Sequence, residues 1–251
     1  MENLYKTKIM KKYLKSNYQM GGYEFHNIEF PKHLLVCSGT GGGKSNFILN
    51  YLKLSSHGKG TIGHLTIVCK QMEELYEMLQ DNYGDDITIH TSLSKLPPLR
   101  EFKEHMGQQQ MVIFDDCVAE KNQSQIEEYF LRARKHGAGV QCVYLSQSYF
   151  KTPIFIRNNV SYLVLLTLSS DADLSRILTN YGVGIDKDIF KKIFKNAVSE
   201  KLCAFKINIG TTDLNNKFSR NFMDYYKLMD EDGNMIQERD IILYRHTGLL
   251  N

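Results

Sequence analysis

Short apolar runs alternate with longer amphipathic runs through most of the chain. Several of the short runs are apolar at almost every position, which is typical of strands buried on both faces of a parallel sheet. The pattern predicts strands over His33–Cys37, Leu65–Cys69, Ile87–Thr91, Met111–Phe114, Val140–Leu145, Tyr162–Leu168 and Leu202–Ile209.

The amphipathic runs predict helices between these strands. They cover Lys44–Leu54, Met72–Asn82, Gln123–His136, Ala172–Tyr181 and Ile185–Asn196. Strands that alternate with helices of this length form βαβ units with right-handed crossovers. The predicted fold class is therefore α/β, with a mostly parallel central sheet flanked by helices.

The pattern weakens at both ends of the chain. Residues 1–30 form a basic lead that contains several tyrosines, and residues 31–210 carry the alternating pattern of one domain. Residues 211–251 are polar and weakly patterned, so we expect a C-terminal appendage or an interface arm there.

Composition narrows the class of protein without indicating a function. A chain of 251 residues can bury a sizeable core, and a formal net charge of +3 permits a nucleic-acid partner without arguing for one. We expect an intracellular protein without membrane contact, because no apolar run could span a bilayer and no signal peptide opens the chain. The cysteines lack metal-ligand spacing and are expected to be reduced: Cys37, Cys69, Cys117, Cys142 and Cys203.

The segment SGTGGGKS, Ser38–Ser45, lies between a predicted strand and a predicted helix. Strand, glycine loop, lysine, hydroxyl and helix in this order indicate a phosphate-binding loop. Glycines leave backbone N–H groups open to an anion, and the start of the helix adds its positive dipole. A flexible glycine turn is the alternative. The motif usually begins with glycine, and we expect Ser38 in that place to loosen the loop slightly.

The loop predicts a site for ATP with Mg²⁺. Lys44 is expected to reach the β- and γ-phosphates, and the Ser45 hydroxyl to ligate the metal. The expected nucleotide-binding residues are Gly39, Thr40, Gly41, Gly42, Gly43, Lys44, Ser45 and Asn46.

Two carboxylates follow the apolar run in MVIFDD, Met111–Asp116. At the end of a buried strand, Asp115 would hold the magnesium shell through water, and Asp116 stands where many ATPases place the glutamate that polarises the attacking water. A strand that simply ends in a polar turn is the alternative. The phosphate-binding loop upstream favours the active-site interpretation.

A third buried strand ends in polar residues in VQCVYLSQS, Val140–Ser148. Gln147 would lie at its carboxyl end, where ligands bind in open α/β sheets. There a glutamine can hydrogen-bond the γ-phosphate or orient the water. A strand-end glutamine in an ordinary turn is the alternative.

These pieces, in this order, resemble an ATPase of the additional-strand P-loop class. SGTGGGKS, VIFDD, RARKHGAGVQCVYLSQSYF and TPIFIRNN are similar to segments of the poxvirus-type viral DNA-packaging ATPases, in the FtsK/HerA superfamily. The small version encoded by virophages is the most similar in length. The resemblance covers Leu34 to about Leu168. It implies an extra strand between the loop strand and the strand that ends in the magnesium aspartate.

The resemblance also implies a function. Such a protein forms a ring of five or six subunits and hydrolyses ATP to drive double-stranded DNA into a preformed capsid. A capsid vertex protein would be a further partner, and the protein would be found in the virion or the host cytoplasm. Lys44, Ser45, Asp115, Asp116 and Gln147 match the family's motif positions. Aspartate in place of the usual glutamate leaves the role of Asp116 as catalytic base open.

Ring motors usually complete each site with an arginine from the neighbouring subunit. Arg134 is the preferred candidate, before Arg132 and Arg157, which is expected in a loop; each could equally be a solvated surface arginine. No DNA-contacting residue is assigned. Two basic clusters could contact DNA, but such clusters are more often simply solvent-exposed surface. They are Lys6, Lys8, Lys11, Lys12 and Lys15 in the lead, and Lys191, Lys192 and Lys195 near a helix.

Three other functions stay open. A helicase or DNA pump of the same superfamily would share every motif. A P-loop kinase would need an arginine-rich lid, yet Thr152–Asn159 holds one arginine. A nucleotide-bound capsid scaffold would bind ATP without turnover.

Overall fold

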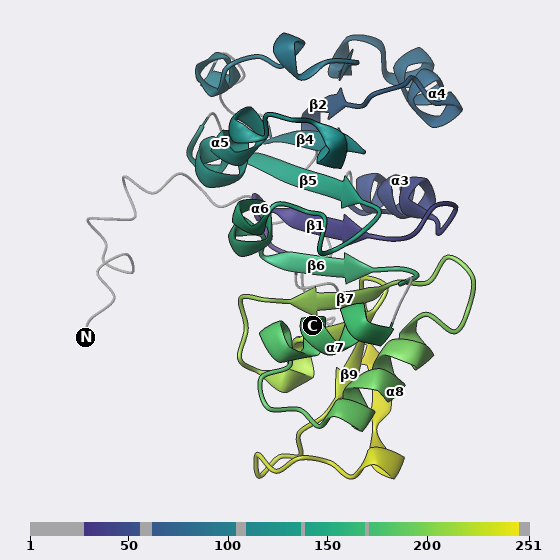
Figure 1. The fold of residues 1–251 in the computed structure, drawn as a ribbon. Coiled ribbons are helices and arrows are strands. Elements are labelled where there is room, and N and C mark those ends of the chain that lie inside the picture. The colour runs from purple at the N-terminus through teal and green to yellow at the C-terminus, as the bar shows by residue number, and fades with distance from the viewer. Residues whose placement is uncertain (1–27, 56–61, 104–108, 137–138, 169–170, 246–251) are drawn as a thin grey trace, which may run out of the picture.

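The structure is a computed structural model that describes residues 28–55, 62–103, 109–136, 139–168 and 171–245. The basic lead expected over residues 1–30 lies almost wholly outside this range. Within the described residues, ten strands form one mixed sheet in the order β10-β9-β8-β7-β6-β1-β5-β4-β2-β3 (Figure 1). The predicted α/β class is confirmed.

Six neighbouring strands of the sheet are parallel, and the other four continue it in antiparallel fashion. The parallel strands are β1 (Leu34–Cys37), β2 (Ile62–Val68), β3 (Ile87–His90), β4 (Gln109–Asp115), β5 (Val140–Ser146) and β6 (Tyr162–Leu165). The antiparallel strands are β7 (Phe205–Asn208), β8 (Phe218–Arg220), β9 (Asp224–Lys227) and β10 (Ile242–Arg245). All seven predicted strands are present.

Four of the predicted strands are shorter than expected: β1 and β3 by one residue each, β6 by three and β7 by four. β6 ends at Leu165, and the two residues that follow bond the end of β1 and the start of the loop after it: the Leu166 N–H donates to the Cys37 carbonyl, and the Thr167 carbonyl accepts from the Gly39 N–H. β7 begins at Phe205, since Leu202 takes a left-handed φ of 69° that extended backbone does not allow. The sheet continues past the boundary expected near Gly210, because β8 pairs with β7.

Helices cover both faces of the sheet. They are α3 (Lys44–Ser55), α4 (Glu74–Tyr83), α5 (Ser124–Arg132), α6 (Ile154–Asn159), α7 (Asp171–Tyr181) and α8 (Lys187–Ala197). One apolar cluster joins α3 and α4 to one face, and a second joins α5, α6, α7 and α8 to the other. Alternate residues of β1 divide between them: Leu34 and Val36 enter the first cluster, and Leu35 and Cys37 the second. This is the period of a strand buried on both faces.

The cysteines are free, and four of the five are buried, as expected for reduced core residues. Among the described residues, no helix has both the length and the apolar character needed to cross a membrane.

Candidate active site at the carboxyl ends of the parallel strands

The glycine-rich loop joins the carboxyl end of β1 to the amino end of α3 (Figure 1). Two backbone hydrogen bonds fix its start. The Ser38 N–H donates to the Ser146 carbonyl of β5 at 3.1 Å, and the Gly39 N–H donates to the Thr167 carbonyl beyond β6 at 3.2 Å. The loop is therefore held by the neighbouring strands on both sides of β1.

Three positions in the loop require glycine. Gly41 and Gly43 have left-handed φ values of 71° and 94°. At Gly42 a Cβ atom would lie 1.9 Å from the Ser38 Oγ and 2.3 Å from the Thr167 Oγ1, so no side chain fits. The backbone can follow this path only without side chains, which is what close approach to a phosphate demands.

Ser38 occupies the place of the motif's first glycine and is buried. Its hydroxyl lies 3.1 Å from the Thr167 Oγ1 and donates to the Gly39 carbonyl at 3.2 Å. The serine therefore ties the loop to the segment after β6, which corrects the expectation that it loosens the loop.

Lys44, Ser45 and Asn46 form the first turn of α3. The Lys44 Nζ donates to the Ser38 carbonyl at 3.4 Å, a long hydrogen bond that a phosphate oxygen could replace with a stronger one. Ser45 is exposed and Asn46 is half-buried. The predicted phosphate-binding residues are thus contiguous around the loop.

The two predicted carboxylates differ in environment. Asp115 is the last residue of β4 and is 9% exposed, whereas Asp116 is exposed and has a left-handed φ of 52°. Burial raises the pKa of the Asp115 carboxyl, while the Tyr76 hydroxyl, 2.6 Å from Asp115 Oδ2, and the charge of Lys44 act in the opposite direction. Lys44 and Asp115 therefore belong to one electrostatic site.

Gln147 follows β5 and lies between the loop and the acidic pair. Its Oε1 accepts from the Thr40 hydroxyl at 3.5 Å, and its Nε2 donates to Asp116 Oδ1 at 3.4 Å. Both contacts are at the outer limit of hydrogen bonding, so they hold the side chain weakly. The structure brings all three predicted motifs together.

The strand order explains this convergence. β5 lies between β1 and β4, so that Cys37 pairs with Ser146, and Leu145 pairs with Asp115. The carboxyl ends of the three strands are level, and ligands bind at this edge in open α/β sheets. β5 is the extra strand that the additional-strand arrangement requires.

Comparison with known proteins supports the fold. No family model matches the chain, and no curated protein matches its sequence. The DNA-packaging ATPase B204 from Sulfolobus Turreted Icosahedral Virus has 12% sequence identity and a TM-score of 0.53, over 76% of this chain and 97% of its own. The genome packaging NTPase B204 of Sulfolobus turreted icosahedral virus 2, in complex with ATP-gammaS, has the same identity, coverage and TM-score.

A conjugation coupling protein also matches in structure. The monomer form of the pCW3 conjugation coupling protein TcpA, with ATPgS, has 13% identity and a TM-score of 0.50, over 78% of this chain and 62% of its own. The chain has the fold of P-loop NTPases. At these identities the matches show the fold alone. The resemblance to FtsK/HerA ATPases, and the finer one to the poxvirus and virophage enzymes, stays a prediction.

The P-loop site suits a metal that arrives with a nucleotide. Among the described residues, no group of three or more His, Cys, Asp or Glu side chains could hold a metal ion. Mg²⁺ usually keeps several waters and binds one or two carboxylates together with substrate phosphates. Ser45 and Asp115 form such a partial donor set, so the site fits nucleotide-bound magnesium.

Arg134 lies away from the P-loop of its own chain. It belongs to the short 3₁₀ turn Ala133–Lys135 after α5. Burial lowers the pKa of His33 and raises that of Cys142, and the charge of Arg134 lowers the pKa of both. Because those residues lie near the amino ends of β1 and β5, Arg134 is at the sheet edge opposite Lys44.

The other two candidate arginines have partners within the chain. Arg132 is exposed and forms an ion pair with Glu128 at 3.4 Å. Arg157 lies in α6, a helix where we expected a loop, because Pro153 at the N-cap has the dihedral angles that start a helix. Its guanidinium lies over the Tyr149 ring, 4.9 Å from the centroid.

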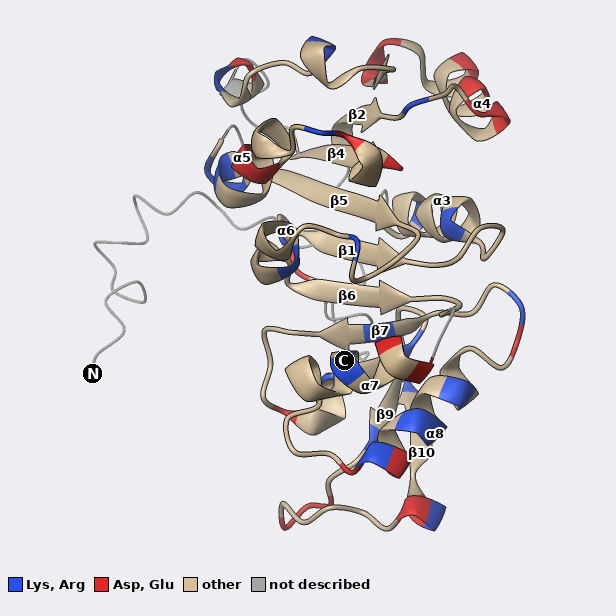
Figure 2. Ribbon diagram, viewed as in Figure 1, with Lys and Arg blue, Asp and Glu red and all other residues tan. Residues whose placement is uncertain are grey.

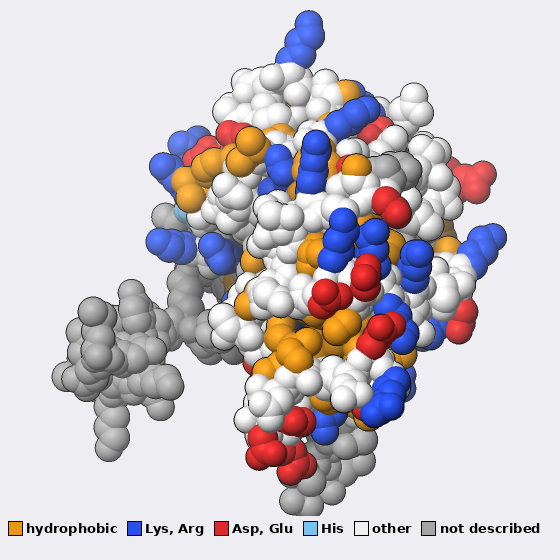
Figure 3. Space-filling model, turned by 60° about the horizontal axis from the view of Figure 1, so that its bottom comes forward, with side chains coloured by type: hydrophobic (Ala, Val, Ile, Leu, Met, Phe, Trp, Pro, Cys, Tyr) orange, Lys and Arg blue, Asp and Glu red, His pale blue; other side chains and the backbone are white. Residues whose placement is uncertain are grey.

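The lysines on α8 lie among acidic residues and do not form a continuous basic surface (Figure 2 and Figure 3). Lys191, Lys192 and Lys195 lie on this helix, and Lys192 pairs with Glu238 at 2.9 Å. Basic and acidic residues are mixed along α8 and the elements beside it (Figure 2), and their side chains are interspersed on the face shown in Figure 3. The basic cluster expected in the lead lies outside the described residues.

Two residues of the site were not predicted from the sequence. Tyr76 of α4 contacts Asp115, and Glu73 is the N-cap residue of α4. Burial raises the pKa of Glu73, and the charge of Asp115 raises it further, so Glu73 is close to the acidic pair. No motif marks either residue, since a tyrosine on the apolar side of a helix resembles any core residue.

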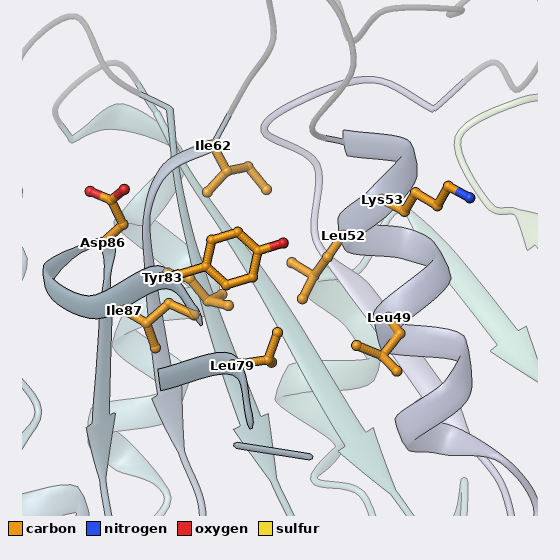
Figure 4. A pocket seen from close by; sticks show the side chains of 9 residues that line it. Leu49, Leu52, Lys53, Ile62, Leu79, Tyr83, Asp86 and Ile87 are labelled. Atoms are coloured by element: carbon orange, nitrogen blue, oxygen red, sulfur yellow. The ribbon is translucent and has the colours of Figure 1, made fainter. Parts of the chain in front are cut away.

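An apolar groove of about 460 Å³ lies elsewhere on the molecule, between α3 and the α4–β3 region (Figure 4). Its walls include Leu49 and Leu52 of α3, Leu79 and Tyr83 of α4, and Ile62 of β2. Its lining includes neither the glycine-rich loop nor Asp115 and Asp116, so it is not the phosphate site.

Proposed function

We propose that the chain is an ATP-hydrolysing ring motor that moves double-stranded DNA, and that its task is to package a viral genome into a capsid. The observation that carries the proposal is the convergence of Lys44, Asp115, Asp116 and Gln147 at one sheet edge, with β5 between β1 and β4. The fold it shares with the packaging ATPase B204 supports the same assignment.

The chemistry assigned to each group follows from its place. Loop N–H groups and Lys44 bind the phosphates of ATP, and Ser45 and Asp115 hold Mg²⁺. When bound there, the metal would supply positive charge beside the β- and γ-phosphates. Asp116 is exposed and has a long contact with Gln147, 3.4 Å. It accepts the proton of the attacking water, and Gln147 orients that water or the γ-phosphate.

In such a ring, Arg134 would act on the nucleotide bound by the neighbouring subunit. A guanidinium supplied in trans stabilises negative charge on the transferring phosphoryl group. Since Arg134 lies at the opposite edge from its own P-loop, it can serve only a neighbouring subunit. We expect five or six subunits, with a capsid vertex protein as a further partner.

A DNA pump of the conjugation type is the second candidate, because the coupling protein TcpA shares the fold. Both candidates would couple ATP hydrolysis to the movement of DNA. They differ in whether a capsid is needed, so encapsidation of DNA into purified empty capsids separates them.

The decisive experiment measures phosphate release from ATP with and without double-stranded DNA. We expect stimulation by DNA of any sequence, falling steeply with salt because backbone contacts release counterions. Native mass measurement should show a ring with ATP and DNA. Transfer of phosphate to a second substrate would instead indicate a kinase. Binding of ATP without turnover would indicate a scaffold. A strict monomer with full turnover would contradict the ring motor.

A further inference from the structure

Tyr76 makes a contact that the roles above do not use. It lies in the first turn of α4, is 1% exposed, and its hydroxyl donates to Asp115 Oδ2 at 2.6 Å. This is among the shorter hydrogen bonds in the site. A tyrosine hydroxyl has an ordinary pKa of about 10, so it is a hydrogen-bond donor at neutral pH.

The position of α4 makes this contact possible. The chain leaves β2, which pairs with β4 so that Val68 lies opposite Phe114, one residue before Asp115. The helix then begins beside the carboxyl end of β4, with the Tyr76 N–H bonded to the Glu73 carbonyl at 2.8 Å. Tyr76 lies in helix α4 and Asp115 in strand β4, so regular secondary structure positions both partners of the hydrogen bond.

A purely structural role is the alternative, because buried tyrosines usually bond some partner. Other buried tyrosines of this chain bond partners other than Asp115 and Asp116. Tyr51 donates to Gln141 at 2.8 Å, Tyr129 donates to the Pro97 carbonyl, and Tyr149 pairs with Tyr181. Among these buried tyrosines, only Tyr76 bonds a carboxylate of the site.

We propose that Tyr76 is a positioning residue, which fixes the Asp115 carboxylate through Oδ2 and leaves Oδ1 to the shell of nucleotide-bound magnesium. The inference rests on the proposed ATPase function. Groups that orient a metal-binding side chain typically change metal affinity 10- to 100-fold when removed. Tyr76 would therefore set how tightly the chain binds the metal, without touching the nucleotide.

Tyr76→Phe tests this, because it keeps the buried ring and removes only the donor. The full-length protein is titrated with Mn²⁺ in the presence of ADP, and bound metal is read by electron paramagnetic resonance. We expect about 10- to 100-fold weaker metal binding, while ADP binding without metal is unchanged. Tyr51→Phe is the matched control, since it removes a buried hydroxyl from the same apolar cluster, and it should bind metal as the wild type does.

A second readout separates positioning from general damage. In turnover assays Tyr76→Phe should need more Mg²⁺ for half-maximal rate, and saturating Mg²⁺ should restore most of the rate. 3-Fluorotyrosine at position 76 keeps the hydroxyl, and its ¹⁹F resonance should shift when Mg²⁺ and ADP are added together. The same label at position 51 should not shift.

The outcomes are distinct. Equal metal affinity of Tyr76→Phe and wild type, or equal loss in Tyr76→Phe and Tyr51→Phe, would overturn the positioning role and leave the ATPase proposal intact. Wild-type protein that binds neither ADP nor Mn²⁺–ADP would overturn the proposed function itself, and this inference with it.

Discussion

Gln141 and Gln147 lie near opposite ends of β5, and their surroundings differ sharply. Gln141 is buried at the amino edge, where its Nε2 donates to the Lys32 carbonyl at 2.6 Å and its Oε1 accepts from Tyr51 at 2.8 Å. Gln147 is exposed at the carboxyl edge, and its two side-chain contacts are 3.4 and 3.5 Å long. The same side chain is locked at one edge and loosely held at the other.

This contrast extends to the neighbouring groups. At the amino edge His33 Nδ1 accepts the Cys142 N–H at 2.9 Å, whereas at the carboxyl edge the Lys44 Nζ reaches the Ser38 carbonyl only at 3.4 Å. Removing one partner of a short buried bond costs stability, while a long exposed contact contributes little and can change partner. We infer that the amino edge stabilises the sheet and the carboxyl edge carries the chemistry.

Lys44→Ala should have the largest effect on the carboxyl edge. It removes the lysine that reaches the β- and γ-phosphates, so steady-state ATP hydrolysis should be lost and nucleotide binding weakened. The urea midpoint of unfolding should not change, because Lys44 makes only a long contact. Lys53→Ala, at the other end of α3, is the control. Normal hydrolysis by pure Lys44→Ala protein would end the P-loop assignment.

Arg134→Ala tests the one amino-edge residue to which we assign chemistry. An arginine acting in trans is worth about 1,000- to 100,000-fold in turnover, so the variant should bind ATP almost normally and hydrolyse it poorly. Lys135→Ala in the same turn should hydrolyse ATP normally.

Mixing then locates the action of Arg134. Lys44→Ala and Arg134→Ala proteins, each inactive alone, should recover partial activity together, because some boundaries pair an intact Lys44 with an intact Arg134. A mixture that stays inactive while native mass data show mixed rings would exclude Arg134, and Arg132 and Arg157 would be tested next.

The acidic pair should divide its roles by burial. Asp116→Asn should bind ATP with magnesium and hydrolyse it about 100- to 10,000-fold more slowly, the usual worth of proton transfer by a side chain. Asp115→Asn should instead weaken magnesium-dependent binding. Single-turnover and equilibrium binding measurements distinguish the two. Identical binding defects, with ATP trapped by neither variant, would refute the division.

The two glutamines give the most direct test of the comparison. Gln147→Leu should lower turnover about 100- to 1,000-fold, as loss of one group that stabilises the transition state does, and leave the unfolding midpoint unchanged. Gln141→Leu should cost about 1–3 kcal/mol of stability and leave turnover unchanged, because it strands the buried Lys32 carbonyl and Tyr51 hydroxyl. The reverse result would break the assignment of edges.

Much of the parallel region could be predicted from the sequence, because its signals are local. The helix expected over Lys44–Leu54 spans Lys44–Ser55, and the strand expected over Val140–Leu145 spans Val140–Ser146. The carboxyl ends of parallel strands lie at the same edge of the sheet. Three motifs that each follow such a strand are therefore expected to lie close together.

The rest depends on contacts that local sequence does not encode. Tyr76 and Asp115 are 39 positions apart, and their bond exists only once α4 packs beside β4. β8 (FSR), β9 (DYYK) and β10 (ILYR) mix polar and apolar residues, so they lack the continuous apolar run that marks β1 and β6 in the sequence. In β10, Ile242 is 54% exposed, so apolar residues there do not mark a buried face.

The smallest expected effect concerns His33, and it touches stability alone. Burial lowers the pKa of His33 to about 3, with the charge of Arg134 acting in the same direction. The hydrogen bond that Nδ1 accepts from Cys142 also requires that nitrogen to be unprotonated. In the unfolded chain the histidine pKa is about 6.5.

Between these two pKa values the unfolded state binds a proton that the folded state does not. Stability should therefore fall as pH drops below about 6.5, at up to about 1.4 kcal/mol per pH unit for this residue. The free energy of unfolding in urea is measured at pH 7.5, 6 and 5 for the wild type and for His33→Asn. The variant should be less stable than the wild type at pH 7.5. Between pH 7.5 and pH 5 its free energy of unfolding should fall by about 2 kcal/mol less than that of the wild type. Parallel pH curves for the two proteins would show that His33 is not the titrating group. A matching fall in nucleotide affinity of the folded protein would contradict the separation of the two edges.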